Sequence, residues 1–127
     1  MTIEEIVSPE FRKNVKILGN EIAWRGTDIM AVLKELAQSG VAAMGLESVI
    51  FPGPDSGPLV YAISDCSGEL RHWRRNEPWE RCVDRALNRS IFDIERTTPN
   101  PYRDSIWYIV CLDPELAWSK SQGDATR

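Results

Sequence analysis

The sequence lacks any apolar stretch long enough to cross a lipid bilayer, since a spanning helix needs about 18 or more consecutive apolar residues. The first five residues carry two acidic side chains and no basic one, whereas a secretory signal opens with basic residues and continues with apolar ones. We therefore expect a cytoplasmic protein with no membrane partner.

Cysteine and histidine are scarce, which excludes several kinds of site. Cys66, Cys82 and Cys111 are an odd number and form no Cys-x-x-Cys pair, so neither a disulfide framework nor a zinc or redox motif is expected. Cys82 and Cys111 lie in apolar patterns and should be inert. His72 is the only histidine, and no EF-hand or clustered Asp-x-Asp pattern is present, so we expect no metal.

Motifs for cofactors and catalysis are missing as well. The sequence contains no dinucleotide-binding glycine motif, no phosphate-binding loop and no Gly-x-Ser-x-Gly segment. The nearest arrangement to a catalytic one is Cys66 six residues before His72, with Asp65 and Asp93 as candidate orienting acids. Closeness in sequence does not establish the hydrogen bonds that a nucleophile and its base need. We expect no cofactor, no catalytic residue and no enzymatic activity, with His72 at the surface.

The charge is acidic overall and unevenly composed. The net charge is -4, and all seven cations between Asp65 and Asn100 are arginines. Such a segment suits planar recognition of carboxylate or phosphate, and it equally suits ion pairing within helices or a genome that favours arginine codons. Aromatic and cationic residues mix from Leu70 to Arg75, as in single-strand binders. The acidic chain nevertheless disfavours a nucleic-acid partner.

Apolar periodicity predicts the helices. A helix is expected from Asp28 to Ser39, ended by Gly40, and a longer one from Pro78 to Arg96. A short helix is expected from Pro9 to Val15. On the polar face of the longest helix, like charges recur four residues apart, which destabilises an isolated helix slightly. That face is either used for a further contact or simply solvated.

Extended segments are expected at Val41–Met44 and Glu47–Phe51. A loop rich in proline and glycine separates the latter from Leu59–Ile63, which predicts an antiparallel hairpin. The unbroken apolar run from Ile106 to Leu112 predicts a central strand that is buried on both faces.

Together these elements predict an α+β fold, with a small mixed or mostly antiparallel sheet of about three to five strands and two or three helices packed on it. Residues 1–118 are expected to form a single globular domain, and residues 119–127 a frayed tail. The predicted core contains Trp79, Leu87, Ile94, Trp107 and Ile109.

Tryptophan, in contrast, is abundant, with five in the chain. Trp24 and Trp73 fall in predicted loops beside Arg25 and Arg74, and an exposed tryptophan next to arginine is typical of a binding hot spot. A tryptophan packed over the end of a helix is the alternative reading of both positions.

Several segments resemble a family of bacterial polymorphic-toxin immunity proteins, the one numbered forty. The similar segments are Asn20–Trp24, Glu35–Gly40, Val41–Val49 and Glu77–Ala86, within a span from Asn20 to Cys111. Gly45 matches the family's Gly-Gly-Asp-Val pattern, while Leu46 and Glu47 stand for its second glycine and its aspartate, and Ser48 is inserted. The resemblance implies an antidote that binds a cognate toxin domain and blocks its active site or its access to substrate.

Many such toxins are basic nucleases, so carboxylates on this chain are expected to meet cations of the partner. The predicted partner-binding residues are Glu21, Trp24, Glu47, Asp55, Trp73 and Arg74. A small-ligand-binding or regulatory domain is the main alternative, and it would show an apolar pocket with convergent polar groups. An enzyme or a nucleic-acid binder is the third class.

Overall fold

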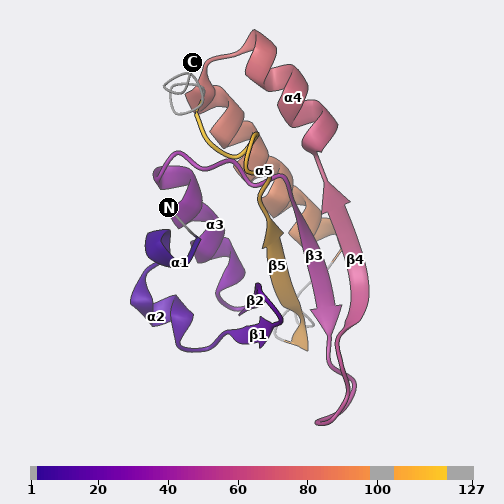
Figure 1. Ribbon diagram of the computed structural model, residues 1–127. Coiled ribbons are helices and arrows are strands. Elements are labelled where there is room, and N and C mark those ends of the chain that lie inside the picture. Colours follow the sequence, from indigo (N-terminus) through magenta and orange to yellow (C-terminus); the bar gives the residue numbers. More distant parts are fainter. Residues whose placement is uncertain (1–2, 98–104, 120–127) are drawn as a thin grey trace.

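The computed structural model describes residues 3–97 and 105–119 (Figure 1). Its five strands are β1 (Lys16–Leu18), β2 (Glu21–Arg25), β3 (Gly45–Ile50), β4 (Leu59–Asp65) and β5 (Trp107–Cys111). Its helices are α1 (Ile3–Ile6), α2 (Pro9–Arg12), α3 (Ile29–Gln38), α4 (Ser67–Asn76) and α5 (Trp79–Thr97). The α+β class is therefore confirmed. None of the helices in the described ranges is long and apolar enough to span a membrane.

The sheet is antiparallel throughout, in the order β1-β2-β5-β3-β4. β5 lies at its centre, as the apolar run predicts. Tyr108 and Ile109 are neighbours on this strand and point to opposite faces, and both are buried. The prediction of a central strand buried on both faces is thus confirmed.

The predicted hairpin is formed by β3 and β4, which pair from Gly45 opposite Asp65 to Ile50 opposite Leu59, with a bulge near Ser48 and Val49. Gly45 is required at the start of β3. A Cβ atom there would lie 2.0 Å from the carbonyl oxygen of Ser64, so any larger residue would push the two strands apart. The segment Val41–Met44, expected to be extended, forms no strand and links α3 to β3.

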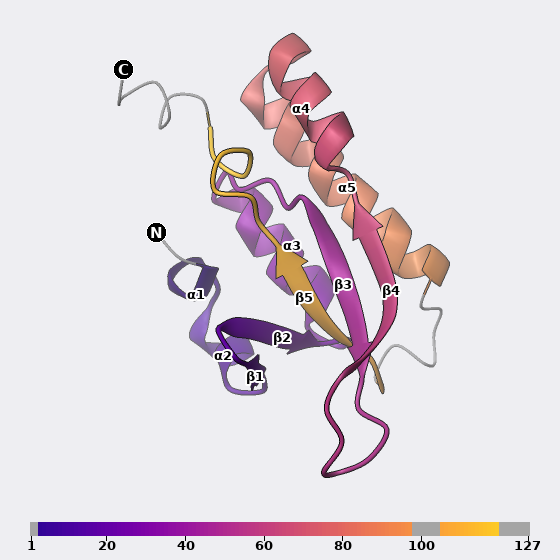
Figure 2. The same cartoon turned by 45° about the vertical axis from the view of Figure 1, so that its right-hand side comes forward.

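The helices α3 and α5 cover one face of the sheet, behind the strands in Figure 2. Trp24, Leu46 and Tyr108 point to this face. The main core combines these side chains with apolar residues of the helices, among them Ile29, Val32, Leu36 and Ile94. The helices therefore fill this face of the sheet.

Two parts of the fold were not predicted. The hairpin of β1 and β2 turns through Gly19, whose φ of 66° suits glycine. Helix α4 occupies a polar segment in which Leu70 is the one fully buried residue. A further difference concerns the predicted core, because the sheet separates Trp107 and Ile109 from Ile94 and Leu87.

Helix α4 explains the charges of α5. Arg85 donates to Glu77, with Nε 2.8 Å from Oε1, and Arg89 pairs with Glu69 of α4 at 2.6 Å. Arg89 also contacts the buried Asp93, with Nε 3.0 Å from Oδ2. Arg85 and Arg89 therefore pair with carboxylates in α4, in α5 and in the turn between the two helices. This agrees with the interpretation that the arginine-rich segment forms ion pairs between and within helices. The predicted tail, apart from Ser119, lies outside the described residues.

Candidate functional site

The face of the sheet opposite α3 and α5 is the candidate site. The register aligns Ala23, Ile109, Glu47 and Ile63 as one row across four strands. Ala23, Val49 and Ile109 form its buried base, bordered by Leu18, Phe51 and Trp107. Within the described part of the chain, none of these six residues belongs to a helix. The face is therefore built from strands and the loop that follows β3. We call it the open face.

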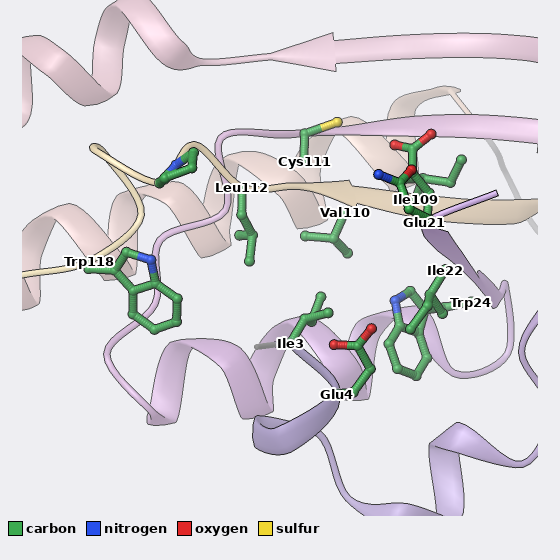
Figure 3. A pocket seen from close by; sticks show the side chains of 12 residues that line it. Ile3, Glu4, Glu21, Ile22, Trp24, Ile109, Val110, Cys111, Leu112 and Trp118 are labelled. Atoms are coloured by element: carbon green, nitrogen blue, oxygen red, sulfur yellow. The ribbon is translucent and has the colours of Figure 1, made fainter. Parts of the chain in front are cut away.

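Three carboxylates gather at one end of the open face, around Cys111. Asp65 lies opposite Gly45, and Gly45 lies opposite Cys111. Glu21 and Glu47 share this face by strand alternation. Figure 3 shows Glu21 and Cys111 on one side of β5, with Val110 and Leu112 on the other. We call Glu21, Glu47 and Asp65 the carboxylate cluster.

The three carboxylates act on one neighbouring thiol, that of Cys111. Burial raises the pKa of the Cys111 thiol, and the negative charges of Glu47, Glu21 and Asp65 raise it further. Within residues 3–97 and 105–119, no ion pair neutralises any of the three carboxylates. The cluster is therefore an unbalanced negative surface that a cationic partner would stabilise.

Cations occupy the other end of the open face. The Lys16 ammonium lies 4.8 Å from the ring centre of Phe51 and 5.0 Å from that of Trp107, and the two rings meet edge to face. Arg25 lies opposite Trp107 in the register. The open face is thus polarised, with carboxylates at one end and cations at the other.

An exposed apolar strip borders the carboxylate cluster. Strand β4 is an outer strand of the sheet, and four of its large apolar side chains are between 51% and 72% exposed. They are Leu59, Val60, Tyr61 and Ile63, which we call the apolar edge. Exposed apolar groups beside charged ones are typical of a protein-binding surface.

The sheet brings together two of the predicted partner-binding residues, Glu21 and Glu47, which are far apart in the sequence. Asp55 is exposed in the loop between β3 and β4 and does not belong to the carboxylate cluster. Asp65 was missed as a binding residue. Its spacing of two from Ile63 at the end of a strand was the available signal, because such residues share a face.

The prediction that Trp24 is an exposed anchor in a loop is wrong. Trp24 lies within β2 and is only 1% exposed. Its indole packs in the main core beneath α3. The loop assignment failed because Trp24 is the one large aromatic residue of a short strand whose outer neighbours, Glu21 and Arg25, are polar.

Trp73 and Arg74 were also predicted to lie in a loop, but both belong to helix α4. Trp73 is half-buried against Leu70 and Ala42, and the guanidinium of Arg85 lies 5.8 Å from its ring centre. Arg74 stacks over Trp79 at 4.7 Å and donates to the carbonyl oxygens of Leu116 and Trp118. These contacts fix the segment after β5 and occupy Arg74 within the fold.

The structure gives Cys66 and His72 different hydrogen-bond neighbours. The buried Cys66 thiol lies 3.8 Å from the Ala43 carbonyl oxygen, and burial raises its pKa to about 11, so the thiolate is scarce at neutral pH. His72 is exposed, as predicted, and contacts Asn76. In the described ranges, no group of three or more His, Cys, Asp and Glu side chains is placed to hold a metal.

A groove of about 570 Å³ opens where β2 and β5 diverge (Figure 3). Apolar side chains line most of it, including Ile3, Val110 and Trp118, while Glu4 and Glu21 supply negative charge and no lining residue is basic. Trp24 also lines the groove, and its Nε1 is buried without a hydrogen-bond partner among the described residues. The surface of the groove is divided about evenly between polar and apolar atoms, so it is less apolar than a typical ligand pocket.

Comparison of the chain with protein-family models, with curated proteins and with solved structures finds no match. The geometry of the open face and of the groove is therefore the basis for the functional proposals that follow.

Proposed function

We propose that the protein is an immunity-type protein that binds a cognate bacterial toxin domain and occludes its active site or its access to substrate. The observation that carries this proposal is the carboxylate cluster beside the apolar edge. Glu21, Glu47 and Asp65 share one face and have no counter-ion among residues 3–97 and 105–119, and β4, which carries Asp65, exposes large apolar side chains.

Charge complementarity favours a basic partner. An unneutralised cluster of carboxylates raises the rate of encounter with a cationic surface and disfavours acidic proteins. The apolar edge supplies area that can be desolvated after the encounter, which charges alone do not provide. A basic nuclease domain, the partner implied by the family resemblance, has the required charge.

The proposal expects the gene immediately upstream to encode a large protein with a variable C-terminal domain, and the test is binding to that domain. We expect coexpression to protect cells from that domain and the two purified proteins to form a stable complex. If neither protection nor a complex is observed, the immunity proposal is wrong. A nuclease domain from an unrelated toxin of similar charge is the matched control, because it separates specific recognition from charge attraction.

A second candidate function, binding of a small ligand, is favoured by the groove at β2 and β5. The Trp24 indole N–H has no hydrogen-bond partner among the described residues and is buried, so a ligand carbonyl would reach it only by displacing a side chain that lines the groove. Glu4 and Glu21 favour a cationic ligand. Titration with L-phenylalaninamide, which combines a ring, a carbonyl and an ammonium, should shift the Trp24 indole resonance. The anion N-acetyl-L-phenylalanine is the control. Equal responses to both compounds, or no response, would contradict this candidate.

A further inference from the structure

Strand β4 is an open edge of the sheet. It pairs with β3 on one side, and among the described elements none lies beyond it (Figure 1). An outer strand exposes a row of unpaired backbone N–H and C=O groups, which proteins commonly protect with lysine, proline or a covering element. Within β4 there is neither lysine nor proline, and the apolar edge leaves the strand accessible.

Two hydrogen bonds define which backbone groups of β4 point outward. Gly26 N–H donates to Ile106 O and Cys66 N–H donates to Met44 O. In an antiparallel ladder, hydrogen-bonded and non-hydrogen-bonded pairs alternate. Both bonds give the same result, in which the backbone groups of Ser64 and Ala62 point toward β3. The N–H and C=O of Ile63, between them, point away from the sheet.

We propose that β4 accepts an extended segment of the toxin domain as a sixth strand, with main-chain hydrogen bonds to Ile63. This inference rests on the proposed function and names the manner of docking. Main-chain pairing supplies affinity, while the alternating side chains of the added strand supply specificity. Asp65 and Ile63 lie on the same face of β4 and therefore face the same set of alternate side chains on the added strand, with Glu47 one strand further in, opposite Ile63. Glu21 is on β2, which β5 and β3 separate from β4, so it acts on the added strand only through long-range attraction.

The neighbouring residues specify the chemistry of this segment. A side chain beside Ile63, which is 72% exposed, should be apolar. A side chain two positions along faces Asp65 and should be lysine or arginine. The favoured segment therefore has an apolar residue and a basic residue two positions apart, so that both side chains lie on the same face of the added strand.

A second copy of this chain is a poorer occupant. Pairing of two β4 strands would place two carboxylate clusters on one continuous sheet, and each chain carries a net charge of -4. Like charges across an interface disfavour association. We therefore expect the free protein to be monomeric, and a dimer that buries β4 would overturn the choice of partner.

The direct test is hydrogen–deuterium exchange in the wild-type protein. The Ile63 amide should exchange rapidly in the free protein and become protected in the complex with the upstream-encoded domain. The Ala62 amide, which points toward β3, should be protected in both states. A complex in which Ile63 still exchanges rapidly would overturn this inference and leave the proposed function intact. Absence of any complex would overturn both.

Substitution gives a second, independent test. Ile63→Pro removes the outward N–H without breaking a bond to β3, because proline is tolerated where the N–H of an edge strand faces solvent. Ile63→Ala is the matched control, since it shortens the side chain and keeps the donor. We expect Ile63→Pro to weaken the complex about tenfold more than Ile63→Ala, provided that circular dichroism shows both variants folded. Equal affinity of the two folded variants would contradict strand addition.

Discussion

Glu47 and Ile63 are directly opposed on β3 and β4, in the non-hydrogen-bonded kind of pair in which side chains approach most closely. A half-buried carboxylate therefore stands beside the most exposed of the large apolar side chains of the described strands. The aliphatic part of Glu47 can extend the apolar edge while its charge stays at the surface. This pair joins the two features that the proposed docking requires.

The two tryptophans of the sheet should differ in their contribution to stability. Trp24 is fully buried in the main core, whereas Trp107 is half-buried on the open face. We expect Trp24→Ala to lower the free energy of unfolding by about 3–5 kcal/mol, and Trp107→Ala by roughly 1–2 kcal/mol. Urea denaturation measures both. Equal losses would contradict the assignment of Trp24 to the core and Trp107 to the open face.

Gly45 should tolerate no side chain. A Cβ at this position would meet the Ser64 carbonyl oxygen at 2.0 Å, so Gly45→Ala should lower the free energy of unfolding by about 1–3 kcal/mol. Gly57→Ala is the matched control, because nothing lies within 4 Å of its Cβ position. That variant should stay within about 0.5 kcal/mol of wild type. Similar stability of both variants would mean that β3 and β4 are not this close.

The Cys66 thiol should be unreactive in the folded protein. Burial raises its pKa to about 11, so at pH 8 nearly all of it is the protonated thiol, which is a poor nucleophile. Alkylation followed by mass spectrometry should modify Cys66 only on unfolding in denaturant. Rapid modification under native conditions, at the rate of a free thiol, would show an accessible thiolate and reopen the question of a cysteine nucleophile.

Glu77 should contribute a pH-dependent part of the stability. Its hydrogen bond from Arg85 lowers the pKa of the carboxyl below its ordinary value of 4.5. Since the folded state favours the carboxylate, the contribution is complete above the unfolded value and is lost as the pH falls through the folded one. The difference in unfolding free energy between wild type and Glu77→Gln should therefore shrink below about pH 4.5. A difference that stays constant from pH 7 to pH 3 would contradict the interaction.

Strong periodicity made part of the fold predictable from the sequence. Three patterns each predict an element at its observed place. They are the apolar stripes of α3 and α5, the turn-rich loop between β3 and β4, and the apolar run of β5. Helix α4 was missed because its burial depends on α5. Leu70 of α4 belongs to one apolar cluster with Cys82, Val83 and Ala86 of α5, and Glu69 pairs with Arg89. A helix that is stabilised by contacts with another helix needs few apolar residues of its own, so its sequence shows little apolar periodicity.

The candidate site was predictable only in part. Glu21 and Glu47 were selected for their charge, and the strand register places them on one face with Asp65. That register could not be read from the sequence, because β1 and β2 are only three and five residues long and show no regular alternation of apolar and polar residues. The predictions for Trp24, Trp73 and Arg74 were wrong for a similar reason. Their neighbours in space come from distant segments of the chain, and the sequence does not reveal those contacts.

The central claim is that the carboxylate cluster receives the partner. The measurement that tests it most directly is the association rate with the upstream-encoded domain, by stopped flow at increasing salt. The variant Glu21→Gln/Glu47→Gln/Asp65→Asn should associate several-fold more slowly at low salt, with a weaker salt dependence and little change in dissociation.

The matched control is Glu10→Gln/Asp84→Asn/Glu95→Gln, which removes the same charge from exposed helical positions. It should associate at nearly the wild-type rate. If the two triple variants slowed association equally, only net charge would matter. If neither changed it, the open face would not be the docking surface, and the account given for this protein would be contradicted.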